Sequence, residues 1–265
     1  MAKLKGNIQF TGSVGDLSAY KRRGSDEIFL RRKGGATKAR IKKDSAFART
    51  RENNAEWGGA SRSGSRVRHA MNSVVHLGDS NIAGRLTALS TAILRLDQVH
   101  QRGERPVQYS AFKYLLDGFN LNLKKPFDSM IRGQVTYSIL RDECKAVIQL
   151  PALIPGLNFF PLSSLPMFRF IIQLGIVPDM VHGPLNQYEQ ANVNMKAGSI
   201  DIYTDFYPTA VKYQGQSLGL SIADHNLDET GTLLLSIGIE FGKVGYDNDV
   251  NPVAYAGAAK VLGVA

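Results

Sequence analysis

Residues 215 to 219, GQSLG, are the stretch of this sequence that most resembles a catalytic motif. In serine hydrolases G-x-S-x-G sets a nucleophilic serine on a strained turn between a strand and a helix, and here Asp224 and His225 follow closely. Ser217, however, opens a segment of alternating apolar residues, which is typical of a strand, and no α/β alternation surrounds it. We therefore expect a glycine-rich turn entering a strand. An esterase acting through Ser217 is the least favoured of three hypotheses.

The sequence likewise contains no motif that predicts a metal-binding or nucleotide-binding site. The five histidines, at positions 69, 76, 100, 182 and 225, show neither the i, i+4 spacing nor the neighbouring cysteine of a zinc site. The segment DNDVN at 247–251 begins like a calcium loop but lacks the central glycine and closing glutamate, so a polar hairpin loop is expected. Neither glycine-rich phosphate motif is present. We expect no catalytic residues, no metal, no cofactor and no enzyme.

The basic segment 17–43 offers different chemistry, because ten of its residues are Lys or Arg and aromatic side chains stand among them. Cations release counterions from phosphates, and aromatic rings stack on bases or pack on protein. Basic clusters commonly only solvate a surface, but apolar residues at regular places favour a folded element over a disordered tail. The expected partner-binding residues are Tyr20, Lys21, Arg22, Arg23, Phe29, Arg31, Arg32, Lys33, Lys38, Arg40, Lys42 and Lys43.

The charge of the chain is concentrated in this first quarter. The net charge is +9, yet residues 1–70 hold 17 Lys and Arg against 6 Asp and Glu, and the remainder holds 15 against 17. Such asymmetry indicates nucleic acid, an anionic surface or an acidic protein partner, including another copy of the chain. Acidic residues expected at strand edges or loops of the remainder are Asp201, Asp205, Asp224, Asp228 and Glu229.

Three segments must position these residues. The strand-forming stretches NIQF and EIFLRR, separated by Gly, Ser and Asp, predict a basic β-hairpin arm over 1–43 with a hinge at Gly34 and Gly35. Two strands alone are marginally stable in water, so the arm needs a surface to lie on. From Asp44, an N-cap residue, a helical segment is predicted over 44–118, with a further short helix at 110–118.

The clearest helix follows Ser80. Its apolar residues recur at steps of four and three and must form one buried stripe. They are Ile82, Leu86, Leu89, Ile93 and Leu96. The repeat lasts about two heptads, which is short for a coiled coil, so packing on a helix or sheet is expected.

Beyond residue 132 the apolar period becomes two, which predicts strands with one face in the core and the other mostly wet. Six or seven such segments with Gly, Pro and Asn turns predict a C-terminal antiparallel β-sandwich over 119–265 and an α+β fold. The apolar last residues, 254–265, are expected to pair into a sheet.

The lone Cys144 cannot form an intramolecular disulfide, which favours a reducing, cytoplasmic location. The basic start is followed by no apolar signal region, and prolines interrupt the most apolar run, so no secretory signal and no membrane span are expected.

Three stretches carry a resemblance: GSVGDLSAYKRRGSDEIFLRRKGG, RTRENNAEWGGASRSG and LLLSIGIEFG. Together they resemble a set of uncharacterised proteins common in Bacteroidota genomes, which share a basic, glycine-punctuated N-terminus and a β-rich C-terminal part. The resemblance implies a bacterial or phage-related, non-secreted protein, and it implies no activity.

Two hypotheses follow. The first is a self-assembling structural protein, whose basic arm docks head-to-tail on the next copy and builds a polymer, tube or shell. The alternative is a nucleic-acid-binding or capsid-like protein whose arm contacts phosphates.

Overall fold

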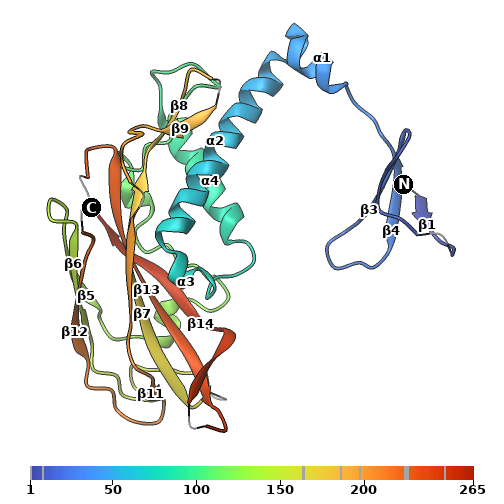
Figure 1. Cartoon of the computed structure of the whole chain (residues 1–265). Helices are drawn as coiled ribbons and strands as arrows, with labels where there is room; N and C mark the ends of the chain where they lie inside the picture. Colours follow the sequence, from blue (N-terminus) through green and yellow to red (C-terminus); the bar gives the residue numbers. More distant parts are fainter. Residues whose placement is uncertain are drawn as a thin grey trace. The chain divides into compact units, whose positions relative to one another are not determined.

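The computed structural model describes residues 2–7, 9–162, 165–185, 187–196, 198–223, 227–247 and 249–265. The chain separates into two compact units, Met1–Arg51 and Glu52–Ala265. Helices and antiparallel sheets are both present, which confirms the predicted α+β class (Figure 1). The predicted division at residues 43 and 118 stays a prediction.

The N-terminal unit contains a four-stranded antiparallel sheet in the order β1-β4-β3-β2. Its strands are β1 (Ala2–Leu4), β2 (Gly12–Val14), β3 (Leu17–Lys21) and β4 (Ile28–Arg32). Glycines with positive φ, Gly15 at 52° and Gly24 at 79°, serve the turns that bracket β3. The strand expected at residues 7–10 is not formed by its described residues, and β1 pairs with β4 instead.

Two short helices and one long helix follow this sheet. They are α1 (Lys38–Lys43), η1 (Ser45–Phe47) and α2 (Ala48–Ala70), of which α2 continues into the second unit. Thr37 caps α1 by accepting a hydrogen bond from the backbone N–H of Arg40. The Asp44 carboxylate accepts one from the N–H of Ala46, which confirms Asp44 as an N-cap.

The other helices are short apart from α4. They are α3 (Asn72–Val75), α4 (Ile82–Leu96), η2 (Lys113–Leu115) and α5 (Phe127–Met130). In α4 the predicted stripe is buried at Ile82, Leu86 and Ile93, whereas Leu96 at its end is half exposed. The expected helix at 110–118 is reduced to the single turn η2.

Most of the second unit is antiparallel sheet. Its strands are β5 (Thr136–Leu140), β6 (Lys145–Leu150), β7 (Met167–Pro178), β8 (Met180–His182), β9 (Tyr188–Gln190), β10 (Ser199–Tyr203), β11 (Tyr207–Pro208), β12 (Gln216–Ser221), β13 (Gly231–Val244) and β14 (Val250–Val264). The larger sheet has the order β10-β7-β13-β14, with β11 pairing β7. A second sheet is ordered β12-β6-β5, and β8 pairs with β9.

The larger sheet is covered on both faces (Figure 1). One apolar cluster joins it to the β12-β6-β5 sheet, and another joins it to α2, α3 and α4. The strict alternation expected from the sequence holds for β6, in which every second residue is buried. It is wrong for β7 and β13, because their second face is covered by helices instead of water.

Small residues permit this close helix packing. A Cβ atom added to Gly175 of β7 would clash with the backbone carbonyl of Ala70, and one added to Gly238 of β13 would lie 2.7 Å from Leu77 Cδ1. Glycine at these two positions lets α2 and α3 approach the strands, so the sheet is buried on both faces.

The last residues belong to this sheet, as predicted. Strand β14 pairs with β13 from Val250 to Val264, and the N–H and carbonyl of Ala265 continue the ladder with Leu233. The guanidinium of Arg141 donates to the carbonyls of Ala265, Asp228 and Gly231, of which Gly231 is the first residue of β13. None of the described helices is long and apolar enough to cross a lipid bilayer.

Candidate anion-binding face of the N-terminal sheet

Two aromatic side chains lie opposite each other at the centre of the N-terminal sheet. The register of β3 and β4 pairs Tyr20 with Phe29, and their ring centroids are 6.1 Å apart. Neighbouring aromatic pairs of this kind stabilise two-stranded contacts. The sequence predicted both residues as partner-binding, and the structure brings them together on one face.

Two guanidinium groups cover these rings. The guanidinium carbon of Arg22 lies 4.3 Å from the centroid of Phe29, and that of Arg31 lies 5.5 Å from the centroid of Tyr20. Cation–π attraction of this kind holds a flexible arginine side chain over the sheet. The result is a strip of alternating cations and rings.

Lys3 extends this strip, and the sequence analysis did not identify it. Its backbone pairs with that of Phe29 in the β1–β4 ladder, so its side chain leaves the sheet on the aromatic face. Its ammonium donates to the Glu27 carboxylate at 2.9 Å. That hydrogen bond, against a smaller effect of burial, lowers the pKa of Glu27. The strand that carries Lys3, Ala2–Leu4, has only three residues, which is too short to show the alternation of apolar and polar residues that predicts a strand.

The other predicted cations of β3 and β4 point elsewhere. Lys21 and Arg32 alternate with Tyr20 and Arg31, so they lie on the opposite face of the sheet. Arg32 forms a 3.9 Å ion pair with Asp16, and Lys33 donates to the carbonyl of Gly15. Arg23 is exposed in the connection between the two strands.

The cations of α1 form a separate group. Lys38, Arg40, Lys42 and Lys43 all belong to this single helix, which has no buried residue. Arg40 is occupied, since its Nε donates to the Asp44 carboxylate at 3.0 Å and its guanidinium covers Phe47. Arg51 donates to the carbonyls of Ile41 and Asp44 and so caps the end of α1. The twelve predicted residues therefore form several surfaces.

The N-terminal sheet has almost no core. Of the described residues in 2–51, only Ala19 and Ile28 are buried, and both lie on the face opposite the aromatic pair. Val14 and Leu17 remain 59% and 40% exposed. A sheet with so little buried apolar area is marginal by itself.

The segment GQSLG, which resembles a hydrolase motif, leads into a β-strand. Ser217 lies within β12, and its hydroxyl accepts a hydrogen bond from the Gln149 amide of β6 at 2.9 Å. Asp224 and His225 lie outside the described residues. The segment 247–251 belongs to the β13–β14 hairpin, in which the N–H of Gly245 donates to the carbonyl of Asp249. Asn248 lies outside the described residues. The described residues form no group of three or more acidic, His or Cys side chains fit for a metal.

A charged cluster that the sequence analysis missed lies in the second unit. The buried carboxylate of Glu240 accepts hydrogen bonds from Arg169 at 2.8 Å and pairs with His76 Nε2 at 2.8 Å. Burial opposes ionisation of Glu240, but the hydrogen bonds from His76 and Arg169 outweigh it and lower its pKa. The guanidinium carbon of Arg169 lies 4.7 Å from the ring centroid of Tyr203 and 4.6 Å from that of Phe206. This closed arrangement fastens α3 to the sheet.

Comparison with known proteins identifies no relative. No protein-family model, no curated protein and no solved structure matches the chain. The resemblance to proteins of Bacteroidota therefore stays a prediction.

Proposed function

We propose that this chain is a self-assembling structural protein, in which the basic N-terminal arm of one copy docks on the body of the next, built as a helix-covered β-sandwich. The observation that supports this most directly is the missing core of the arm. Because its sheet buries only Ala19 and Ile28 among the described residues, most of its stability must come from another surface.

The excess positive charge belongs to the N-terminal unit, and the second unit is nearly neutral but exposes acidic side chains. Residues 1–51 hold 14 Lys and Arg against 4 Asp and Glu, whereas residues 52–265 hold 18 against 19. Asp201, Asp205 and Glu229 are exposed on the second unit and offer acidic contacts, whereas Asp228 is held by Thr230 and Asn192. Attraction of this sign would guide docking, with a strength that falls as salt rises.

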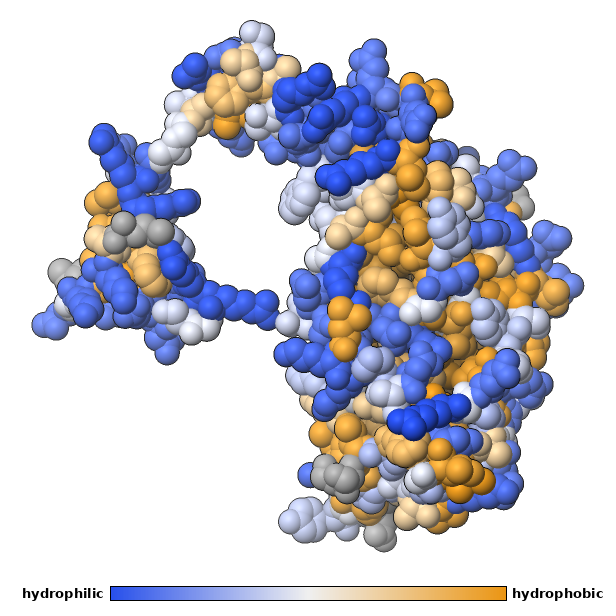
Figure 2. Space-filling view, turned by 180° about the vertical axis from the view of Figure 1, so that it is seen from behind, coloured by the Kyte–Doolittle hydropathy of each residue, from blue (hydrophilic) through white to orange (hydrophobic). Residues whose placement is uncertain are grey.

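Apolar side chains are also available for contact. Figure 2 shows apolar surface in several places on the visible face of the second unit. Trp57, Tyr246 and Tyr255 are 66%, 108% and 79% exposed. Aromatic side chains are enriched in the centres of protein interfaces. Head-to-tail contact between two different surfaces repeats from copy to copy and yields rings, tubes or filaments.

A nucleic-acid-binding or capsid-like role is the second candidate, and the cation and ring strip favours it. Arg22, Arg31 and Lys3 could contact phosphates, and Tyr20 and Phe29 could stack on bases. Each ring already carries a guanidinium, so a base would have to displace an arginine from its ring. We therefore rank this function second.

Negative-stain images and light scattering of the purified chain test the first proposal. We expect large regular assemblies, and a chain without residues 1–43 should stay unassembled while circular dichroism shows its strands intact. A monomer at high concentration, or polymerisation of the shortened chain, would contradict arm docking. For the second candidate, native material should carry nucleic acid, and affinity for single-stranded DNA should fall steeply with salt. Pure-protein absorbance in native material would count against it.

A further inference from the structure

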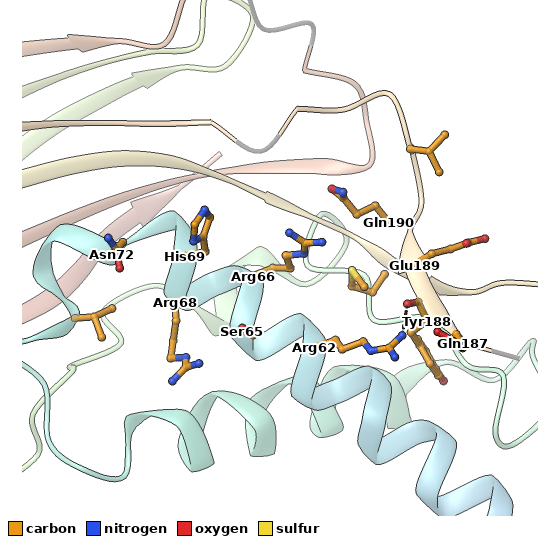
Figure 3. Close-up of a pocket in the computed structure, with 13 residues that line it drawn as sticks. Arg62, Ser65, Arg66, Arg68, His69, Asn72, Gln187, Tyr188, Glu189 and Gln190 are labelled. Atoms are coloured by element: carbon orange, nitrogen blue, oxygen red, sulfur yellow. Dashed lines mark hydrogen bonds between the residues drawn. The ribbon is translucent and has the colours of Figure 1, made fainter. Parts of the chain in front are cut away.

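A cavity of about 840 Å³ lies within the second unit, between α2 and the β8–β9 hairpin (Figure 3). Its volume is in the range of small-molecule sites. The proposed assembly through the basic arm does not involve this cavity, which contains no residue of the arm. Polar side chains dominate the helical wall.

The helical wall of the cavity is basic. Arg62, Arg66 and His69 follow one another at steps of four and three residues, so they occupy successive turns on one face of α2 and line the cavity. A neighbouring face of the helix carries the buried residues Val67 and Ala70. Because the second unit as a whole has nearly equal numbers of acidic and basic residues, Arg62 and Arg66 form a local concentration of positive charge beside the His69 imidazole.

Protein contacts hold both walls in place. Arg62 Nη1 donates to the backbone carbonyl of Tyr188 at 2.7 Å, which ties α2 to β9. The Tyr188 ring is buried against Gly59, where an added Cβ atom would lie 2.6 Å from ring carbons. The Tyr188 hydroxyl donates to the carbonyl of Arg105 at 2.8 Å. A cavity fixed in this way needs little reorganisation on binding.

The Arg66 and His69 side chains, farther along the helix, are available to a ligand. Neither Arg66 nor His69 makes a hydrogen bond or ion pair with another described residue. Figure 3 shows the Gln190 amide turned toward the side of the cavity on which Arg66 lies, while the Glu189 carboxylate extends away from that side. Glu189, the one acidic residue among the described residues that line the cavity, therefore leaves the basic wall open to an anion.

We propose that this cavity binds a small molecule that carries a diphosphate or longer phosphate chain. Arginine forks match phosphate oxygens in geometry, and the neutral Gln190 amide adds a donor without repelling the anion. The seven residue steps from Arg62 to His69 span about 10 Å of helix. Consecutive phosphoryl groups would reach more of this row than one monophosphate does.

Isothermal titration of the full chain with inorganic pyrophosphate, at constant ionic strength, tests this assignment. We expect saturable binding, and the double variant Arg66→Gln/His69→Gln should bind at least about tenfold more weakly. Monophosphate and citrate serve as parallel titrants, and both should bind more weakly than pyrophosphate. Because the two replaced side chains have no described protein partner, the variant should melt at the native temperature.

Arg95→Gln on the exposed end of α4 is the matched control, since it removes one positive charge outside the cavity. It should leave pyrophosphate binding unchanged. The assignment is overturned if the native chain shows no saturable binding, if the double variant binds as tightly as the native chain, or if Arg95→Gln weakens binding equally. Tighter binding of citrate would overturn the phosphate specificity.

Discussion

Tyr20 and Phe29 are direct partners across β3 and β4, and each ring is covered by an arginine that comes from the strand of the other or its extension. Arg31 of β4 covers Tyr20, and Arg22, just after β3, covers Phe29. This reciprocal arrangement gives the N-terminal sheet one face with ordered cations. The opposite face carries Lys21 and Arg32, so the same strands allow a test of position at constant charge.

Arg22→Gln/Arg31→Gln should weaken arm binding more than Lys21→Gln/Arg32→Gln. Each double variant removes two positive charges, but only the first removes those held over the rings. If the arm acts through its ordered face, light scattering should show assembly lost in the first variant and largely kept in the second. Equal losses would mean that total charge alone matters, and the salt dependence should then change equally as well.

Gly175→Ala should destabilise the second unit by roughly 1–3 kcal/mol, because the new methyl group would clash with the Ala70 carbonyl and push α2 from the sheet. Gly219→Ala is the matched control, since its added Cβ atom meets nothing within 4 Å on the exposed face of β12. Urea unfolding followed by circular dichroism measures both. Similar midpoints for the two variants would contradict the close helix packing.

Glu240 should make the stability of the second unit depend on pH. Its pKa in the folded protein is lower than the ordinary glutamate value of 4.5, so its contribution is fully present above about pH 4.5 and is lost as pH falls through the lower folded value. Glu240→Gln should cost roughly 1–3 kcal/mol at neutral pH and reduce the acid loss.

Glu143→Gln is the control for that measurement. Glu143 pairs with Lys145 at an exposed position, so its loss should change stability little. Thermal unfolding between pH 3 and pH 7 distinguishes the two variants. If the melting temperature of Glu240→Gln falls with decreasing pH as steeply as that of the native protein, other carboxylates cause the loss of stability in acid.

Cys144 should react slowly with iodoacetamide in the folded protein and fast after unfolding. The thiol is buried, and burial raises its pKa although the charge of Arg141 opposes the shift, so little reactive thiolate is present at neutral pH. Mass spectrometry of timed reactions would follow this single thiol. Fast modification without unfolding would mean that the loop before β6 opens.

The sequence by itself determined those features whose signal is local. Apolar residues at steps of four and three predicted the buried stripe of α4, and the residue type of Asp44 predicted an N-cap. The alternation of apolar and polar residues predicted that one face of β6 is exposed to solvent. Strand alternation likewise marked GQSLG as the entrance of β12. These features depend on the spacing of side chains along a single helix or strand, and this spacing can be read from the sequence.

Only the tertiary structure decided which faces meet. That β7 and β13 are buried on both sides follows from helices that pack on Gly175 and Gly238, a contact between residues about a hundred positions or more apart. The pairing of Lys3 with Phe29, the closed cluster around Glu240 and the cavity beside Arg66 have the same origin. Contacts of this kind depend on strand register and helix docking, and many arrangements satisfy the same apolar pattern until the whole chain selects one.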